Sequence, residues 1–199
     1  MKKFELTSES IANIFGKRLF RIKALIEFGN VKEGELGGFV EKEENLSHEG
    51  NAWVCGNAKV YGDAKVCGNA WVYGDAKVYG NAWVYGNAWV YGNAWVCGNA
   101  EVCGNAKVYG DAKVYGNAEV YGNAWVCWDA DYATVKGFGT EYRTTTFFKC
   151  KDGIARVRCG CFYGDLEEFR NQVKNTRKGK IAEEYLMIAD LMEKHFKKE

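Results

Sequence analysis

The fold is decided by a run of short, nearly identical units, of which residues 74–97 are typical: GDAKVYGNAWVYGNAWVYGNAWVC. Thirteen copies of the hexad Gly-(Asn/Asp)-Ala-x-Val-(Tyr/Cys) follow one another from Gly50 to Cys127 without insertion or deletion. Within a hexad, Ala and Val alternate with x and the last residue, so the two pairs point to opposite faces of a short strand. Gly adopts positive φ freely and Asn or Asp tolerates it, so each Gly-(Asn/Asp) pair predicts a bend.

A fixed short period indicates a solenoid, because no single hexad can bury its Ala and Val alone. If three bends close one coil, the valines eighteen residues apart form an internal column: Val54, Val72, Val90, Val108 and Val126. Successive members of a column are expected about 4.8 Å apart, the spacing of neighbouring strands. The thirteen hexads then make a little over four coils and a rod about 20 Å long.

The hexads resemble those of hexapeptide-repeat proteins, which form a left-handed parallel β-helix. Handedness is implied by this resemblance alone, because most parallel crossovers are right-handed. Residues 36–47, LGGFVEKEENLS, and residues 144–169, TTTFFKCKDGIARVRCGCFYGDLEEF, resemble the flanks of such proteins encoded by phages and prophages. Val40 and Leu46 keep the spacing of six, so the β-helix is expected to begin there in degraded form.

The sequence predicts a mainly β fold with three segments. These are an N-terminal β cap (1–38), the left-handed parallel β-helix (39–133) and a small C-terminal α+β domain (134–199) of a hairpin plus two helices. The cap would cover the first coil, whose unpaired backbone is otherwise an aggregation edge. In the last segment, Asp152-Gly153 is a strong hairpin signal that aligns Phe148 with Val157. Asp165, with an acidic residue three positions later, predicts a helix start.

The outward x positions form three ladders with different chemistry. The first ladder carries Trp53, Trp71, Trp89, Lys107 and Trp125, beside Tyr73, Tyr91 and Tyr109; the second carries Lys59, Lys77, Trp95 and Lys113; the third carries Lys65, Trp83, Glu101 and Glu119. At half exposure the first ladder would present roughly 500 to 900 Å² of aromatic surface, which equals or exceeds the largest patch on ordinary monomers.

Three interpretations of this surface remain open. The rings could cover one another and only stabilise the rod. They could form a homo-oligomer interface, with a trimer favoured by the resemblance. They could also bind a ligand, since aromatic rings interleaved with Lys suit a base and its phosphate. Arg156 and Arg158, with Lys149, form a further candidate clamp for phosphate or carboxylate, against the alternative of a solvated strand face.

The histidine inventory argues against catalysis. Many left-handed β-helix proteins are acyltransferases in which a His at a subunit interface acts as base. Here only His48 and His195 occur, both outside the hexads, and no loop is inserted between coils. Zinc bound by Cys150, Cys159, Cys161 and His195 is a weaker interpretation than buried structural thiols. The sequence thus predicts no catalytic residue, no metal and no cofactor.

Composition narrows the partners and the location. A net charge of +1 argues against binding of duplex nucleic acid. The chain shows no signal peptide and no membrane-spanning run, and the hexad register leaves its cysteines too far apart for disulfides, so a reducing cytoplasm is expected. We expect a non-enzymatic phage-type binding protein that sequesters a host ligand such as a nucleotide immune signal. The alternatives are a protein-binding scaffold and, third, an acyltransferase.

Overall fold

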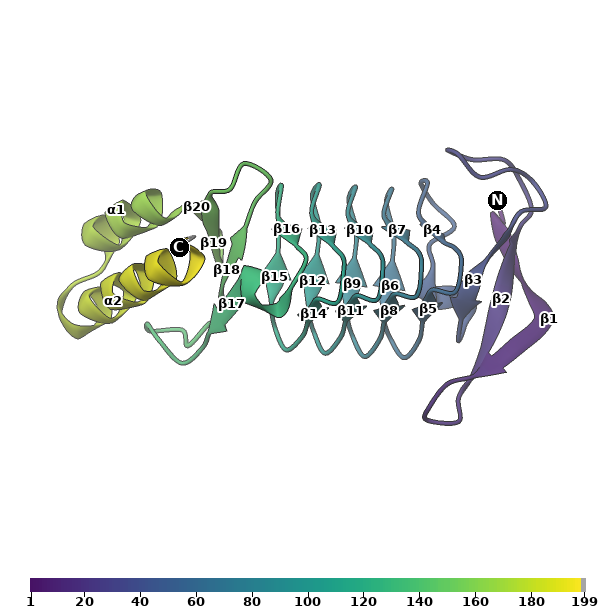
Figure 1. Ribbon diagram of the computed structural model, residues 1–199, viewed down its shortest axis with the longest axis horizontal. Coiled ribbons are helices and arrows are strands. Elements are labelled where there is room, and N and C mark those ends of the chain that lie inside the picture. Colours follow the sequence, from purple (N-terminus) through teal and green to yellow (C-terminus); the bar gives the residue numbers. More distant parts are fainter. Residues whose placement is uncertain (198–199) are drawn as a thin grey trace.

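The computed structural model describes residues 1–197, which form a parallel β-solenoid closed by strands at one end and by a sheet with two helices at the other (Figure 1). Thirteen two-residue strands build the coils: β4 (Trp53–Val54), β5 (Lys59–Val60), β6 (Lys65–Val66), β7 (Trp71–Val72), β8 (Lys77–Val78), β9 (Trp83–Val84), β10 (Trp89–Val90), β11 (Trp95–Val96), β12 (Glu101–Val102), β13 (Lys107–Val108), β14 (Lys113–Val114), β15 (Glu119–Val120) and β16 (Trp125–Val126).

The strands of the coils pair in parallel at the predicted period of eighteen residues. Val72 lies between Val54 and Val90, and the other columns follow the same rule. The Val and Ala side chains of the hexads are fully buried and form one continuous core. The predicted solenoid and its register are therefore confirmed, whereas the handedness of the coil stays an expectation of the resemblance.

The corners depend on glycine and on amide ladders. Every hexad glycine has positive φ, for example +70° at Gly86. At one corner the Nδ2 group of Asn69 donates to Asn87 Oδ1 at 3.1 Å, and Asn87 donates in turn to Asn105 at 3.1 Å. Stacked amides of this kind satisfy one another along the rod, as they do in cross-β assemblies.

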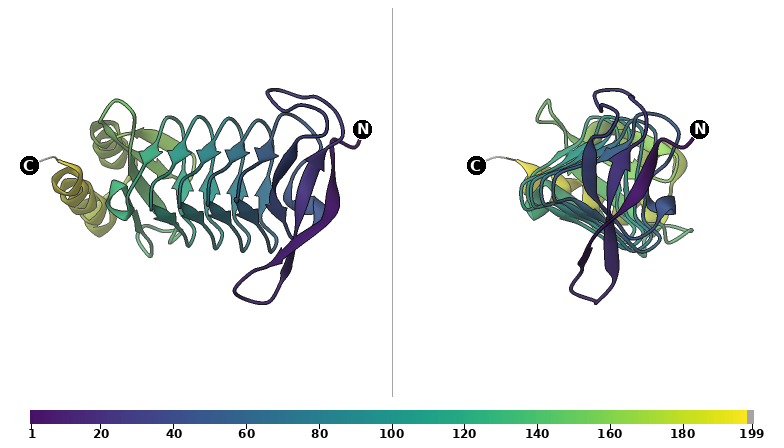
Figure 2. Two further views of the ribbon diagram at one scale, coloured as in Figure 1. Left: turned by 45° about the vertical axis from the view of Figure 1, so that its right-hand side comes forward. Right: turned by 90° about the vertical axis from the view of Figure 1, so that its right-hand side faces the viewer.

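The N-terminal strands β1 (Phe4–Ala12), β2 (Arg18–Ala24) and β3 (Leu36–Val40) form an antiparallel meander across the first coil (Figure 2). β3 joins the solenoid in parallel, with Val40 beside Val60, and after the short helix η1 (Glu43–Asn45) Leu46 bridges to Val66. Both residues thus continue the Val columns, as predicted. His48 lies six residues before Val54, where the hexad spacing predicts the next column residue, but Leu46 takes the column position instead.

The two ends of the solenoid are closed with opposite polarity. At the first coil, carbonyl oxygens lack a preceding coil, and Asn45 Nδ2 donates to two of them, Gly62 O at 3.0 Å and Ala64 O at 2.8 Å. At the last coil, N–H groups lack a following coil. There Lys113 N donates to Asp129 Oδ1 at 2.7 Å, and Glu119 N donates to a threonine hydroxyl at 3.0 Å. Each end therefore satisfies its backbone instead of exposing a strand edge.

The C-terminal part is an antiparallel sheet with two helices on one face (Figure 1). Its elements are η2 (Asp129–Asp131), β17 (Tyr132–Val135), β18 (Thr145–Lys149), β19 (Ala155–Cys159), β20 (Phe162–Asp165), α1 (Leu166–Thr176) and α2 (Gly179–Phe196). Phe148 packs into the solenoid core, whereas Phe147 packs under the helices. The sheet therefore separates two cores. Residues 198 and 199 of the predicted 134–199 segment lie outside the described residues.

The predicted hairpin exists, but its register differs by one residue. Phe147 pairs with Val157 and Phe148 with Arg156, where the two-residue loop had aligned Phe148 with Val157. The cause is a longer turn, in which Cys150 N donates to Ile154 O at 3.1 Å and Gly153 has φ of +80°. A three-residue loop with its glycine in the left-handed region is the next commonest hairpin connection.

Candidate functional site

The tyrosines of the first ladder stack on one another. The ring centroids of Tyr73 and Tyr91 are 4.8 Å apart at an interplanar angle of 1°, and those of Tyr91 and Tyr109 are 5.1 Å apart at 8°. Partial burial raises the pKa of each of these phenols. At this spacing no ligand ring fits between two rungs, so the tyrosines serve the first interpretation, mutual stacking.

The tryptophans are instead interleaved with lysines. The Lys107 ammonium lies 4.7 Å from the Trp89 ring centroid and 5.5 Å from that of Trp125. On the second ladder, Lys77 and Lys113 lie 4.4 and 5.5 Å from the Trp95 ring. The predicted mixture of aromatic rings and cations is thus realised as cation–π contacts between neighbouring coils.

The position of each predicted ladder residue follows from the register. Lys59 lies beside Lys77, and Trp71 lies partly buried between Trp53 and Trp89. Trp89 is 40% exposed, so a large part of its ring meets solvent.

Trp53 was expected on the exposed ladder, and this expectation is wrong. Its side chain is fully buried, with its ring centroid 5.4 Å from that of Phe28 and 6.5 Å from that of Phe4. The N-terminal segment folds over this first rung and removes it from the surface. The exposed part of the first ladder therefore begins at Trp71.

The first ladder ends in a depression that we call the Trp125 groove, lined by Asn105, Lys107, Asn123, Trp125, Lys151 and Asp152, with a volume of about 590 Å³. Lys107 comes from the solenoid, whereas Lys151 comes from the loop between β18 and β19. The Lys151 ammonium lies 5.6 Å from the Trp125 ring centroid. Lys151 N also donates to Asn123 O at 3.2 Å, which holds the loop against the corner of the last coil.

The Trp125 groove is electropositive. Within residues 1–197, neither Lys107 nor Lys151 has a carboxylate oxygen within 4.0 Å. The one acid in the lining, Asp152, is neutralised by the Arg156 guanidinium, which donates to its two oxygens at 2.8 and 2.6 Å. The bond from Arg156 lowers the pKa of Asp152 to about 2, so this carboxylate stays ionised and occupied.

The arginines predicted as an anion clamp have other partners. Arg156 is held by Asp152, and Arg158 Nε lies 2.9 Å from Glu119 Oε2. Lys149 pairs across the hairpin with Ala155, on the opposite face of the sheet, and its ammonium lies 3.0 Å from a carboxylate oxygen of Asp131. The predicted clamp is therefore wrong. Arg156, Arg158 and Lys149 each form an ion pair within the chain, and they do not lie together on one face of the sheet.

Sequence reasoning missed Lys151 as a groove residue. It directly precedes the Asp152-Gly153 turn, so its place at a hairpin tip was evident. Its position over Trp125 arises only from the packing of that hairpin on the last coil. The available signal was the position of Lys151 directly before a turn. This position alone does not distinguish a site residue from a solvated one.

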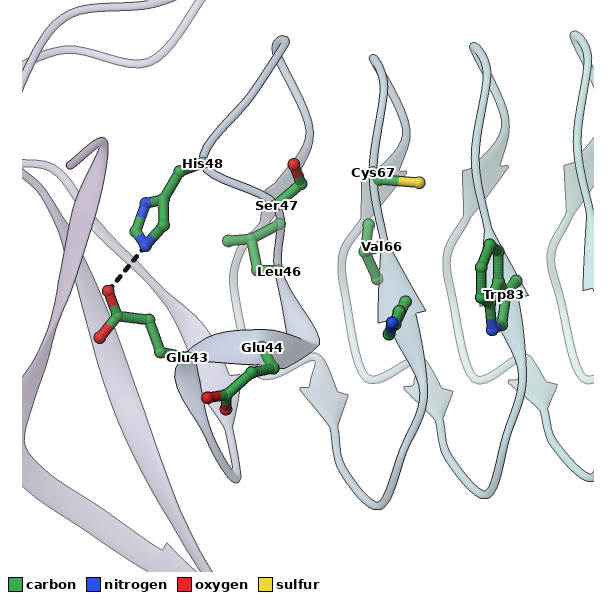
Figure 3. Close-up of a pocket in the computed structure, with 9 residues that line it drawn as sticks. Glu43, Glu44, Leu46, Ser47, His48, Val66, Cys67 and Trp83 are labelled. Atoms are coloured by element: carbon green, nitrogen blue, oxygen red, sulfur yellow. Dashed lines mark hydrogen bonds and ion pairs between the residues drawn. The ribbon is translucent and has the colours of Figure 1, made fainter. Parts of the chain in front are cut away.

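A second depression lies on the third ladder near the N-terminal end, with a volume of about 570 Å³ (Figure 3). Lys65 lies 5.3 Å from the ring centroid of Trp83, which is 43% exposed. Its rim carries Glu43 and Glu44, and Figure 3 shows His48 directed at Glu43. These carboxylates make the depression less suited to an anion than the Trp125 groove.

Both ring nitrogens of His48 are occupied. Nδ1 accepts from Lys3 N at 3.1 Å, and Nε2 lies 2.7 Å from Glu43 Oε1. The ring also stacks on Phe4 at 4.3 Å. This bond with His48 is the main cause that lowers the pKa of Glu43. His48 therefore joins the N-terminal strand to η1, and His195 lies far along the chain with Nε2 3.1 Å from Ala130 O.

The four candidate zinc ligands, Cys150, Cys159, Cys161 and His195, do not form one cluster. Cys150 packs in the solenoid core and Cys159 against the helical core, on opposite faces of the sheet. Within residues 1–197, no three His, Cys, Asp or Glu side chains cluster closely enough to hold a metal ion. All eight cysteines are free thiols. No helix of the described part is both long and apolar enough to cross a membrane.

The repeats match one known family. The family model described as YdcK beta solenoid repeat matches residues 76–92 and 82–98, two overlapping stretches within the hexads. No curated protein matches the chain. Residues 76–98 are thus similar to YdcK beta solenoid repeats, in agreement with the architecture described above.

Proposed function

We propose that the chain is a non-catalytic binding protein that holds a nucleotide-like anion in the Trp125 groove. The observation that carries the proposal is the convergence of Lys107 and Lys151 on one indole, with no carboxylate partner on either ammonium among residues 1–197. A phosphate would lie between the two ammonium groups, and a base would lie against Trp125.

The energetics favour exchange of a lysine for a base. An exposed cation–π contact is worth about 0.5–1 kcal/mol, whereas stacking of a base on an aromatic side chain is worth about 1–3 kcal/mol. A lysine displaced from the Trp125 ring also gains a phosphate as partner. The groove can therefore open to a base at little cost.

Binding without turnover fits the side chains of the groove. Its amides and ammonium groups can position an anion, while both nitrogens of His48 are occupied at the other end of the solenoid. A protein of this kind would withdraw its ligand from solution. The resemblance to phage and prophage proteins makes a host nucleotide signal the candidate ligand and the bacterial cytoplasm the expected location.

Isothermal titration calorimetry with AMP, cyclic AMP and a cyclic dinucleotide tests the proposal. We expect at least one ligand to bind with a dissociation constant below about 1 mM. Lys107→Gln and Lys151→Gln should each weaken it about tenfold, and Trp125→Phe should weaken stacking while the fold is kept. Lys65→Gln is the matched control, because Lys65 makes the same contact with Trp83 on another ladder.

Two results would overturn the proposal. One is the absence of saturable binding by any of the three ligands; the other is equal weakening by Lys65→Gln and Lys107→Gln. Native mass spectrometry of protein purified from cells adds an independent readout, because it shows retained ligand mass and subunit number in one spectrum. A trimer that retains extra mass in the nucleotide range would favour ligand sites between subunits.

A further inference from the structure

The C-terminal part holds a second, chemically different cavity of about 400 Å³. It is enclosed by the segment 138–143, by the β19–β20 turn, by α1 and by Tyr185 of α2. It lies on the helical side of the sheet, away from the solenoid and the Trp125 groove. Of its lining residues, the sequence interpretations named only Cys159 and Cys161, as candidate zinc ligands.

The floor of this cavity is apolar. Phe162 and Phe169 pack with their ring centroids 5.5 Å apart, and Phe169 lies edge-on to Tyr185 at 5.8 Å. Phe138 and Val173 complete the apolar lining. Such a floor suits a flat apolar group of a ligand.

Two guanidinium groups lie on the rim, on Arg143 and Arg177. Within residues 1–197 neither has a carboxylate oxygen within 4.0 Å, in contrast to Arg156, Arg158 and Arg170. The only acid in the lining is Glu141, which is exposed. The rim therefore carries excess positive charge beside an apolar floor.

Glycines beside the cavity let the side chains of Arg143 and Tyr185 lie close to the backbone. Gly160 has φ of +59°, and a Cβ there would meet Arg143 Nη1 at 2.7 Å, so glycine leaves the room in which the guanidinium lies. Gly139 likewise has φ of +73°, and a Cβ there would meet the Tyr185 hydroxyl at 2.5 Å. Tyr142 is the one non-glycine residue of the described chain with positive φ, at 49°. Strained backbone of this kind persists where surrounding structure holds it.

The Tyr185 hydroxyl helps to hold the wall. It donates to Phe138 O at 3.2 Å and thereby ties α2 to the segment 138–143. Burial and, to a smaller extent, Cys159 raise the pKa of this phenol, while the positive charge of Arg177 acts in the opposite direction. The cavity thus has an apolar floor, a polar tie at its wall and two cations at its rim.

We propose that this cavity binds a small molecule in which an oxyanion is attached to a flat apolar group. Arg143 and Arg177 bind the oxyanion, since guanidinium groups match phosphate and carboxylate oxygens in pairs. The phenylalanine floor takes the apolar group. Phosphate and carboxylate share this chemistry, and separate probes distinguish them.

The test uses the full chain with phenyl phosphate, benzoate and inorganic phosphate as probes in calorimetric titrations. We expect phenyl phosphate, benzoate or both to bind saturably, and inorganic phosphate at least about tenfold more weakly, because it lacks the apolar group. Arg143→Gln and Arg177→Gln should each weaken binding about tenfold. Arg18→Gln is the control, since Arg18 is an exposed arginine of β2 at the other end of the molecule.

The three probes and the variants distinguish the possible results. Binding of only one aromatic probe supports the proposal and identifies the oxyanion. The proposal is overturned if neither aromatic probe binds, if inorganic phosphate binds as tightly as they do, or if Arg18→Gln weakens binding as much as Arg143→Gln. Lys107→Gln should leave this binding unchanged, so failure of the Trp125 groove and failure of this cavity are distinguishable.

Discussion

The Nζ group of Lys3 donates to the carbonyl oxygen of Ala52 at 2.9 Å, beneath the N-terminal strands. In the next coil the equivalent carbonyl, that of Ala70, accepts from Trp53 N at 3.0 Å. Lys3 therefore supplies with its side chain the donor that a preceding coil would have supplied with its backbone. The same ammonium donates to Gly50 O at 3.2 Å and lies 4.6 Å from the Phe28 ring centroid.

Lys3→Met should reveal this buried ammonium as a dependence of stability on pH. Burial lowers the pKa of Lys3 from 10.5 to about 8, so between these values the unfolded chain binds more protons than the folded one. Wild-type stability relative to Lys3→Met should therefore rise from pH 8 towards pH 10.5, by up to roughly 3 kcal/mol. At pH 7 relief of charge burial and loss of two hydrogen bonds oppose each other, so the two proteins should differ little.

Urea denaturation of both proteins at pH 7, 8.5 and 9.5 measures this difference. Lys2→Met is the matched control, because it removes a neighbouring ammonium that is exposed and paired with Glu43. A difference between wild type and Lys3→Met that stays constant over this range contradicts the prediction.

The repeats could be predicted from sequence because a strict period transmits one local rule to every coil. Val72 must lie beside Val54 and Val90 once three hexads close a coil. The surface was less predictable, since contacts there join segments that are distant in sequence. Trp53 is covered by Phe28, and no periodicity carries that information.

The C-terminal cations illustrate the same limit. The Arg156–Asp152 ion pair spans four residues and was within reach of sequence reasoning. The partner of Arg158 depends on docking of the sheet on the last coil, and on a hairpin register that the turn type shifted by one residue.

Gly86→Ala should destabilise the solenoid more than Gly116→Ala. Both glycines have positive φ, +70° and +72°, so alanine is strained at either site by about 1–2 kcal/mol. At Gly86 a Cβ would also meet Gly104 N of the next coil at 3.0 Å, whereas at Gly116 nothing lies within 4 Å. The tighter site should cost about 1–3 kcal/mol more. Equal urea midpoints for the two variants would contradict the prediction, because the contact of the new Cβ with the next coil would then add no cost at Gly86.

The thiols should react at very different rates. Burial, and to a smaller extent Glu35, raises the pKa of Cys55 to about 11, whereas Cys161 is exposed. Two units above the reference value of 9.0 leave the folded chain about a hundredfold less Cys55 thiolate at neutral pH. Peptide mass spectrometry after timed alkylation with iodoacetamide at pH 7.5 should find Cys161 modified first. Cys55 should react at least about a hundredfold faster in urea; similar folded and unfolded rates would refute its burial.

The ion pair between Arg158 Nε and Glu119 Oε2, at 2.9 Å, ties the C-terminal sheet to the last coil. Its side chains are 25% and 38% exposed, so solvent screens the pair and its coupling energy should be only about 0.5–1 kcal/mol. Arg158 also lies 5.0 Å from the Tyr121 ring centroid, a contact that Glu119 lacks. Arg158→Gln should therefore cost more than Glu119→Gln, by about 0.5–1 kcal/mol.

A double-mutant cycle of Arg158→Gln and Glu119→Gln, followed by urea denaturation, separates the two contributions. The pair Arg170 and Asp190, which joins α1 to α2 at 2.8 Å within the C-terminal part, provides the matched cycle. If the C-terminal sheet and the solenoid unfold together, the variants of both cycles should each show a single urea transition. A coupling of zero for Arg158 and Glu119, with a measurable one for Arg170 and Asp190, would contradict the prediction that the Arg158–Glu119 pair stabilises the contact between the sheet and the last coil.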